Sequence, residues 1–175
     1  MRTSRGNRQG WILDRFLGAG ALDTLFRGSM GFFLQLGYQY VDMEKAAQDA
    51  KSTGMLIKGF RQVGEARESA GLEAENRGRL LTARNEYHRA AKCYARAQWA
   101  IFDDNNEKRE LHGKCVECYA KVIAYNPTPI EKIEIIHGEG KLFGYLHQPR
   151  GDGPHPCVLF CPGLDMVKED FPNPE

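Results

Sequence analysis

The sequence predicts an α/β fold in which an N-terminal α-helical domain precedes the first strands of an incomplete α/β sheet. Apolar residues recur at spacings of three and four between residues 23 and 126, a period typical of amphipathic helices. From Ile130 onward the period changes to two, which is typical of strands. Pro127 and Pro129 separate the two patterns, because proline cannot continue a helix. We therefore expect a flexible N-terminus (1–22), a helical domain (23–126) and the start of an α/β core (127–175).

The helical domain is expected to contain two long antiparallel helices, at 72–102 and 107–125. Each has an apolar face and an opposite charged face. Asp103-Asp104-Asn105-Asn106 between them forms a polar turn whose side chains can cap a helix. Two further helices are expected at 24–40 and 43–63, although several glycines lower their helix propensity.

The composition excludes several classes of protein. The chain has 175 residues and a formal net charge of +1, with basic and acidic residues interspersed, so no basic face for nucleic acid is present. MRTSRGNR at the start is not followed by the apolar run of a signal peptide, and the stretch GSMGFFLQLGYQY is shorter than the ~20 residues of a membrane helix. We expect a cytoplasmic protein with neither nucleic acid nor membrane as a partner.

The five cysteines favour reduced thiols over a disulfide framework. Cys115-Val-Glu-Cys118, with His112 nearby, could be read as a metal or redox motif. The surrounding segment has helical periodicity, however, and no second CxxC is present. Free cysteines usually pack like small apolar residues, so we favour buried or half-buried helix thiols and expect no metal.

A β-hairpin and one further strand are expected after the prolines. IEKIEII (130–136) alternates apolar and charged residues, GEG (138–140) is a turn, and KLFGYLHQP (141–149) is the second strand. CVLFC (157–161) is a continuous apolar run of the kind that occurs in strands buried on both faces. We expect this strand, including Cys157 and Cys161, to lie in a core.

The segment HPCVLFCPGLDMVKED (155–170) and the helical segment RAAKCYARAQWAIF (89–102) carry a resemblance to a known family. The chain resembles α/β hydrolases with an N-terminal helical cap domain, the group of the 2,6-dihydroxypseudooxynicotine hydrolases and the fungal polyketide-shortening hydrolases. The resemblance implies an α/β-hydrolase sheet of which this chain holds only the first strands. It also implies no organic cofactor.

In this family the turn after the first core strand supplies half of the oxyanion hole. The resemblance therefore assigns the Leu164 backbone N–H to the oxyanion and gives Gly163 the role of allowing close approach to the substrate. Cys161-Pro162-Gly163 lacks the histidine that many α/β hydrolases carry at this turn. The acids that follow, Asp165, Glu169 and Asp170, are expected to be solvated or to start a helix.

A catalytic serine on a G-x-S-x-G elbow is absent from the sequence. The four serines, at positions 4, 29, 52 and 69, all precede the first expected strand, and the near matches RGSMG and RESAG lie in helical surroundings. Cys161 with His155 as its base is the remaining pair, but the elbow normally follows a later strand. We expect the chain to be the N-terminal portion of a serine hydrolase and to be inactive alone.

The resemblance implies that the longer enzyme cleaves an ester, or a C–C bond adjacent to a carbonyl, in a small organic substrate. Helix aromatics could line the pocket, namely Phe32, Phe33, Tyr38, Tyr40, Trp99 and Phe102. The sequence leaves a homodimer open.

A helical-repeat interaction module of the tetratricopeptide type is the alternative. The alanine and tyrosine spacing resembles such repeats at Ala83, Tyr87, Ala90, Ala91 and Tyr94. Tyr94 and Tyr119 lie only 25 residues apart, however, whereas that repeat has a period of about 34.

Overall fold

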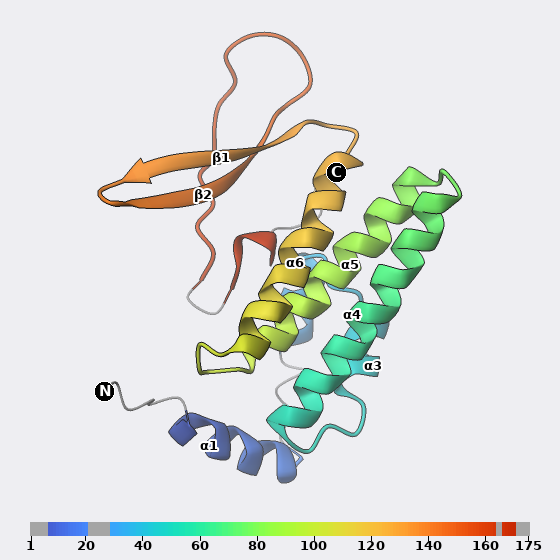
Figure 1. The fold of residues 1–175 in the computed structure, drawn as a ribbon, viewed down its shortest axis with the longest axis vertical. Helices are drawn as coiled ribbons and strands as arrows, with labels where there is room; N and C mark the ends of the chain where they lie inside the picture. Colours follow the sequence, from blue (N-terminus) through green and yellow to red (C-terminus); the bar gives the residue numbers. More distant parts are fainter. Residues whose placement is uncertain (1–6, 21–28, 164–165, 171–175) are drawn as a thin grey trace.

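Three long helices form the main layer of the computed structural model, which describes residues 7–20, 29–163 and 166–170. These helices, α4 (Thr53–Asn76), α5 (Leu80–Trp99) and α6 (Asn106–Ala124), lie side by side with alternating directions (Figure 1). The other elements are α1 (Asn7–Gly18), helical residues 29–35, α3 (Tyr40–Ala47), β1 (Ile130–His137), β2 (Gly140–His147) and the 3-10 helix η1 (Lys168–Asp170). No helix among the described residues is long and apolar enough to cross a membrane.

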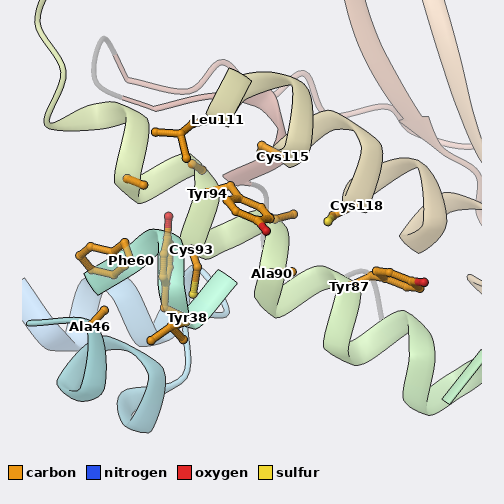
Figure 2. Packing of buried hydrophobic residues seen from close by; sticks show 14 of the residues in the cluster. Tyr38, Ala46, Phe60, Tyr87, Ala90, Cys93, Tyr94, Leu111, Cys115 and Cys118 are labelled. Carbon is orange, nitrogen blue, oxygen red and sulfur yellow. The ribbon is translucent and has the colours of Figure 1, made fainter. Parts of the chain in front are cut away.

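The central helix α5 packs through small residues. Ala83, Ala90, Ala91 and Ala97 are fully buried, so the neighbouring helices can approach α5 closely. Larger side chains fill the space around this alanine row, and Figure 2 shows Tyr94 with Cys115 and Cys118 in one part of the cluster. The resulting core joins α3, α4, α5 and α6.

The turn between α5 and α6 has the expected cap. The side chain of Asn105 accepts a hydrogen bond from the Lys108 N–H at 2.9 Å and satisfies a free donor in the first turn of α6. Helix α6 begins and ends within one residue of the expected range. This part of the sequence prediction is confirmed.

The helix expected at 72–102 is in fact two helices. Helix α4 ends at Asn76, the chain reverses at residues 77–79, and α5 begins at Leu80. Gly78 has a φ of +70°, a left-handed conformation that favours glycine and ends helices. The helix expected at 43–63 is also divided, because α3 ends at Ala47 and α4 begins at Thr53.

The segment expected to be a flexible N-terminus contains helix α1. Asp14 on α1 accepts hydrogen bonds from the Thr53 N–H, at 2.6 Å, and from the Thr53 hydroxyl. Thr53 is the first residue of α4, so the carboxylate lies at the positive end of that helix dipole. Residues 21–28, the start of the helix expected at 24–40, lie outside the described residues.

The β-hairpin is confirmed. Strands β1 and β2 pair antiparallel, with Ile130 opposite His147 and His137 opposite Gly140. Gly138 in the two-residue turn has a φ of +59°, as such hairpin turns require. Within the described part of the chain, the sheet consists of these two strands.

The prediction of a buried strand at 157–161 is wrong for this structure. The segment is extended but unpaired, and Val158 and Leu159 are 89% and 86% exposed. Cys157 and Cys161 are exposed as well, whereas they were expected to lie in a core. An apolar run of this kind is buried only when strands flank it on both sides, and no such strands flank it in the described residues.

Candidate functional site

The glycine turn is followed closely by the 3-10 helix η1, and we call its two buried acids, Glu169 and Asp170, the anchor. Gly163 is exposed, and its carbonyl oxygen accepts a hydrogen bond from the Met166 N–H at 3.0 Å. Leu164, the expected oxyanion donor, lies outside the described residues, as does Asp165. Helix η1 then packs against α5 and α6. The turn is thus tied directly to an element that sits on the helical layer.

Asp170 of η1 is 2% exposed and points into the helical layer. The Tyr38 hydroxyl donates a short hydrogen bond to Asp170 Oδ1. Arg96 Nη2 on α5 lies 4.0 Å from Asp170 Oδ2, and the Val167 N–H donates to the same oxygen at 3.2 Å. The Asp170 carboxylate therefore accepts a hydrogen bond from its own segment and also connects η1 to Tyr38 and to Arg96 of the helical domain.

Glu169 is fully buried beside Asp170. The Tyr145 hydroxyl of β2 donates to Glu169 Oε1 at 2.9 Å, and Lys168 Nζ pairs with the same oxygen. The Tyr145 ring lies 4.9 Å from that of Tyr119 on α6. Glu169 thereby connects η1 to the hairpin. Of the two expected environments for Glu169 and Asp170, the solvated one is wrong because both side chains are buried, whereas both residues do lie in a short helix, η1.

Two cations of α5, Lys92 and Arg96, lie on the buried side of the helix and face this anchor. Lys92 is 1% exposed and Arg96 is 6% exposed. The Arg96 guanidinium is surrounded by aromatic rings, at 4.7 Å from the ring centre of Phe33 and 5.5 Å from those of Tyr38 and Trp99. Such cation–π contacts stabilise a desolvated guanidinium. Three of the six aromatics expected to line a pocket thus surround this arginine.

Burial shifts the pKa values of three side chains around the anchor, those of Lys92, Tyr38 and Tyr145. It lowers the pKa of Lys92 to about 8, although the negative charge of Asp170 partly opposes this shift. Burial, together with the Asp170 carboxylate, raises the pKa of Tyr38 well above its usual value. Burial and Glu169 likewise raise the pKa of Tyr145. Both tyrosines therefore remain protonated and serve as hydrogen-bond donors.

The thiols and serines of the described residues are not arranged for catalysis. Cys115 and Cys118 are buried in α6, as expected, and burial raises the pKa of Cys118 to about 12. Ser69 lies within α4, and Ser29 begins the helical residues 29–35. His155 Nε2 lies 3.3 Å from the carbonyl oxygen of Gly151. No group of three metal-ligating side chains occurs among the described residues.

The sequence contained a signal for this anchor that periodicity alone does not reveal. Lys92 and Arg96 stand four residues apart among the buried alanines of α5. Two charges on the apolar face of a helix require buried partners. Those partners come from distant parts of the sequence, because Tyr38 precedes α5 and Asp170 follows it 132 positions after Tyr38.

The helical layer followed by the hairpin is the arrangement of the N-terminal part of an α/β hydrolase. The structure is similar to the crystal structure of 2,6-dihydroxy-pseudo-oxynicotine hydrolase, with a TM-score of 0.68 and 26% identity over 81% of this chain and 39% of that chain. The model of the FrsA-like esterases matches residues 65–173, more than half of the chain. The chain belongs to the FrsA-like esterase family.

Curated relatives agree with this membership. Esterase FrsA of Klebsiella pneumoniae (strain 342) is 31% identical over 107 residues, which are 61% of this chain and 25% of that protein. The 2,6-dihydropseudooxynicotine hydrolase of Paenarthrobacter nicotinovorans is 33% identical over 101 residues, 56% of this chain and 27% of that protein. The chain thus matches about a quarter of the length of these relatives. Since the family match includes α5 and α6, it favours the hydrolase over the helical-repeat alternative.

Proposed function

We propose that this chain supplies the helical cap and one half of the oxyanion hole of a serine α/β hydrolase. The substrate is a small organic molecule with an ester, or with a C–C bond adjacent to a carbonyl. The observation that carries the proposal is the anchored glycine turn. Gly163 is hydrogen-bonded to the segment that η1 fixes on the helical layer, within a chain that belongs to an esterase family.

The chemistry follows from the turn. When a serine oxygen attacks the carbonyl carbon, the electron pair of the C=O bond moves onto the carbonyl oxygen. Backbone N–H groups held in place stabilise that negative charge, and each such donor contributes on the order of 10²–10³ in rate. We assign one donor to the Leu164 N–H, while Gly163 leaves room for the substrate because it has no Cβ. This chemistry needs no cofactor or metal.

The exposed apolar surface supports a larger assembled core. Ile136 and Leu142 of the hairpin are 77% and 55% exposed, and Val158 and Leu159 are more so. Apolar residues gathered in this way usually pack against further protein. We propose that they pack against strands of an α/β-hydrolase sheet that also carries the G-x-S-x-G nucleophile. The five free cysteines support a cytoplasmic location, and a homodimer is compatible with the proposal.

The test compares this chain with the product of the complete reading frame. Both are purified and assayed with p-nitrophenyl acetate and with a fluorophosphonate probe that labels activated serines. We expect the 175-residue chain to show no turnover above buffer and no labelling. The complete product should hydrolyse the ester and carry the label on a serine of G-x-S-x-G beyond residue 175. Turnover by the 175 residues alone would contradict the proposal.

A further inference from the structure

We infer that Arg96 is a positioning residue for the glycine turn: through Asp170 and Tyr38, the helical layer holds the segment whose Met166 N–H restrains the Gly163 carbonyl. This inference rests on the proposed function and deepens it. It gives the helical domain a task in addition to covering the substrate.

The first step is the geometry of a single peptide group. The carbonyl of Gly163 and the N–H assigned to the oxyanion belong to the same peptide unit. Peptide units are planar, so a restraint on a carbonyl also limits rotation of the N–H in the same unit. The 3.0 Å hydrogen bond from the Met166 N–H is such a restraint on the Gly163 carbonyl.

The second step is the attachment of that hydrogen bond to η1. Met166 lies two residues before Lys168, where η1 begins. The Val167 N–H donates to the Asp170 side chain at 3.2 Å, and the Asp170 N–H donates to the Val167 carbonyl at 2.9 Å. These reciprocal bonds join Asp170 to Val167, the residue after Met166. A displacement of Asp170 would consequently move the donor that holds Gly163.

The third step is the dependence of Asp170 on Arg96. Asp170 is 2% exposed, so its charge must be balanced by protein groups. Arg96 lies 4.0 Å from the carboxylate and 3.4 Å from the Tyr38 hydroxyl, which itself donates to Asp170. The three side chains form a closed triangle. Loss of the Arg96 guanidinium would leave the buried Asp170 carboxylate with less positive charge nearby. Separation of η1 from the helical layer would then become more favourable.

The neighbouring cations hold different positions, although the charge of Asp170 also acts on Lys92. Lys92 is held over the Tyr38 ring, at 5.3 Å, and Lys168 pairs with Glu169 rather than with Asp170. Glu169 is bonded to Tyr145 of the hairpin. Among the ion pairs of the described residues, Asp170 is paired with Arg96.

The test measures amide hydrogen exchange in the 175-residue chain, which requires no activity. In Arg96→Met and Tyr38→Phe, exchange of the amides of Met166, Val167 and Asp170 should accelerate about tenfold or more, because a hydrogen bond to a buried charge is lost. Exchange in the middle of α4 and α6 should not change. Arg109→Met, which removes the exposed pair with Asp104, is the matched control and should leave all these rates unchanged.

The second readout uses the complete reading-frame product. Arg96→Met should lower kcat about tenfold or more with little change in KM, since oxyanion stabilisation acts in the transition state. Arg96→Lys should restore part of the kcat. If exchange accelerates but the complete product hydrolyses nothing, the proposed function fails while the anchoring stands. If the product is active and Arg96→Met alters neither exchange nor kcat, the positioning role is refuted.

Discussion

Replacing Gly59 by alanine tests the close approach of α3 to α4. An added Cβ at this position would lie 1.9 Å from the carbonyl oxygen of Ala46, whereas ordinary contact begins near 3.4 Å. The two helices would have to separate by about 1.5 Å. Since α3 begins two residues after Tyr38, such a shift would also disturb the triangle around Asp170.

The magnitude follows from two opposing effects. Alanine is more favourable than glycine in a helix interior by about 1 kcal/mol. Overpacking against a backbone group costs about 3 kcal/mol or more, so the net loss in the free energy of unfolding should be about 2 kcal/mol. For a chain of this length, that loss corresponds to a fall in Tm of about 4–8 °C.

Urea denaturation followed by circular dichroism at 222 nm measures the difference. Gly113→Ala in α6 is the matched control, because no heavy atom lies within 4 Å of its added Cβ. This control should raise the free energy of unfolding by about 0.5–1 kcal/mol. If Gly59→Ala stabilised the chain as much as Gly113→Ala, the close packing of Gly59 in α4 against Ala46 in α3 would be refuted.

Three further predictions concern acid stability, thiols and solubility. Glu75 accepts hydrogen bonds that lower its pKa to about 2, so the stability it contributes is complete above about pH 4.5 and is lost as the pH falls toward 2. The Glu75→Gln variant should therefore be about 1–2 kcal/mol less stable at pH 7, and its stability should depend less on pH between 4.5 and 2. Thermal melts at several pH values measure both effects. Ellman's reagent should modify two thiols rapidly in the native chain, Cys157 and Cys161, and all five in denaturant. The double variant Val158→Ser, Leu159→Ser should aggregate less by light scattering, with Tm unchanged.

Each of these predictions has an outcome that contradicts it. Glu73→Gln is the control for the acid prediction, because Glu73 forms an exposed ion pair with Arg77. If Glu73→Gln changed the pH dependence of stability as much as Glu75→Gln, the acid effect would not be specific to Glu75. Rapid modification of more than two native thiols would contradict the burial of the helix cysteines. Unchanged aggregation of the serine double variant would show that the exposed run 157–161 is not the cause.

The features that local patterns predicted are those built from local interactions. Helix α6 follows from its apolar period and the Asn105 cap, and the hairpin follows from strict alternation around a glycine turn. The division between α4 and α5 was missed because the apolar pattern continues across it. A single left-handed residue, Gly78, reverses the chain there.

The anchor could not be derived from local patterns, because its parts are distant in the sequence. Asp170 and Glu169 look like surface acids until Tyr38, Arg96 and Tyr145 are placed around them. Conversely, the run at 157–161 looks like a core strand, yet burial of a strand depends on its neighbours and not on its own composition. The family resemblance did identify the segment, since 155–170 carries both the turn and the anchor.

We propose above that the glycine turn of this chain stabilises the oxyanion of an ester-type hydrolase. A crystal structure of the complete reading-frame product with a phosphonate bound covalently to its serine tests this claim directly. We predict that the Leu164 amide nitrogen lies about 2.7–3.1 Å from the phosphonyl oxygen and that Asp170 still contacts Arg96 and Tyr38. A phosphonyl oxygen bound by other groups, with the Leu164 amide directed away from it, would refute this role of the glycine turn.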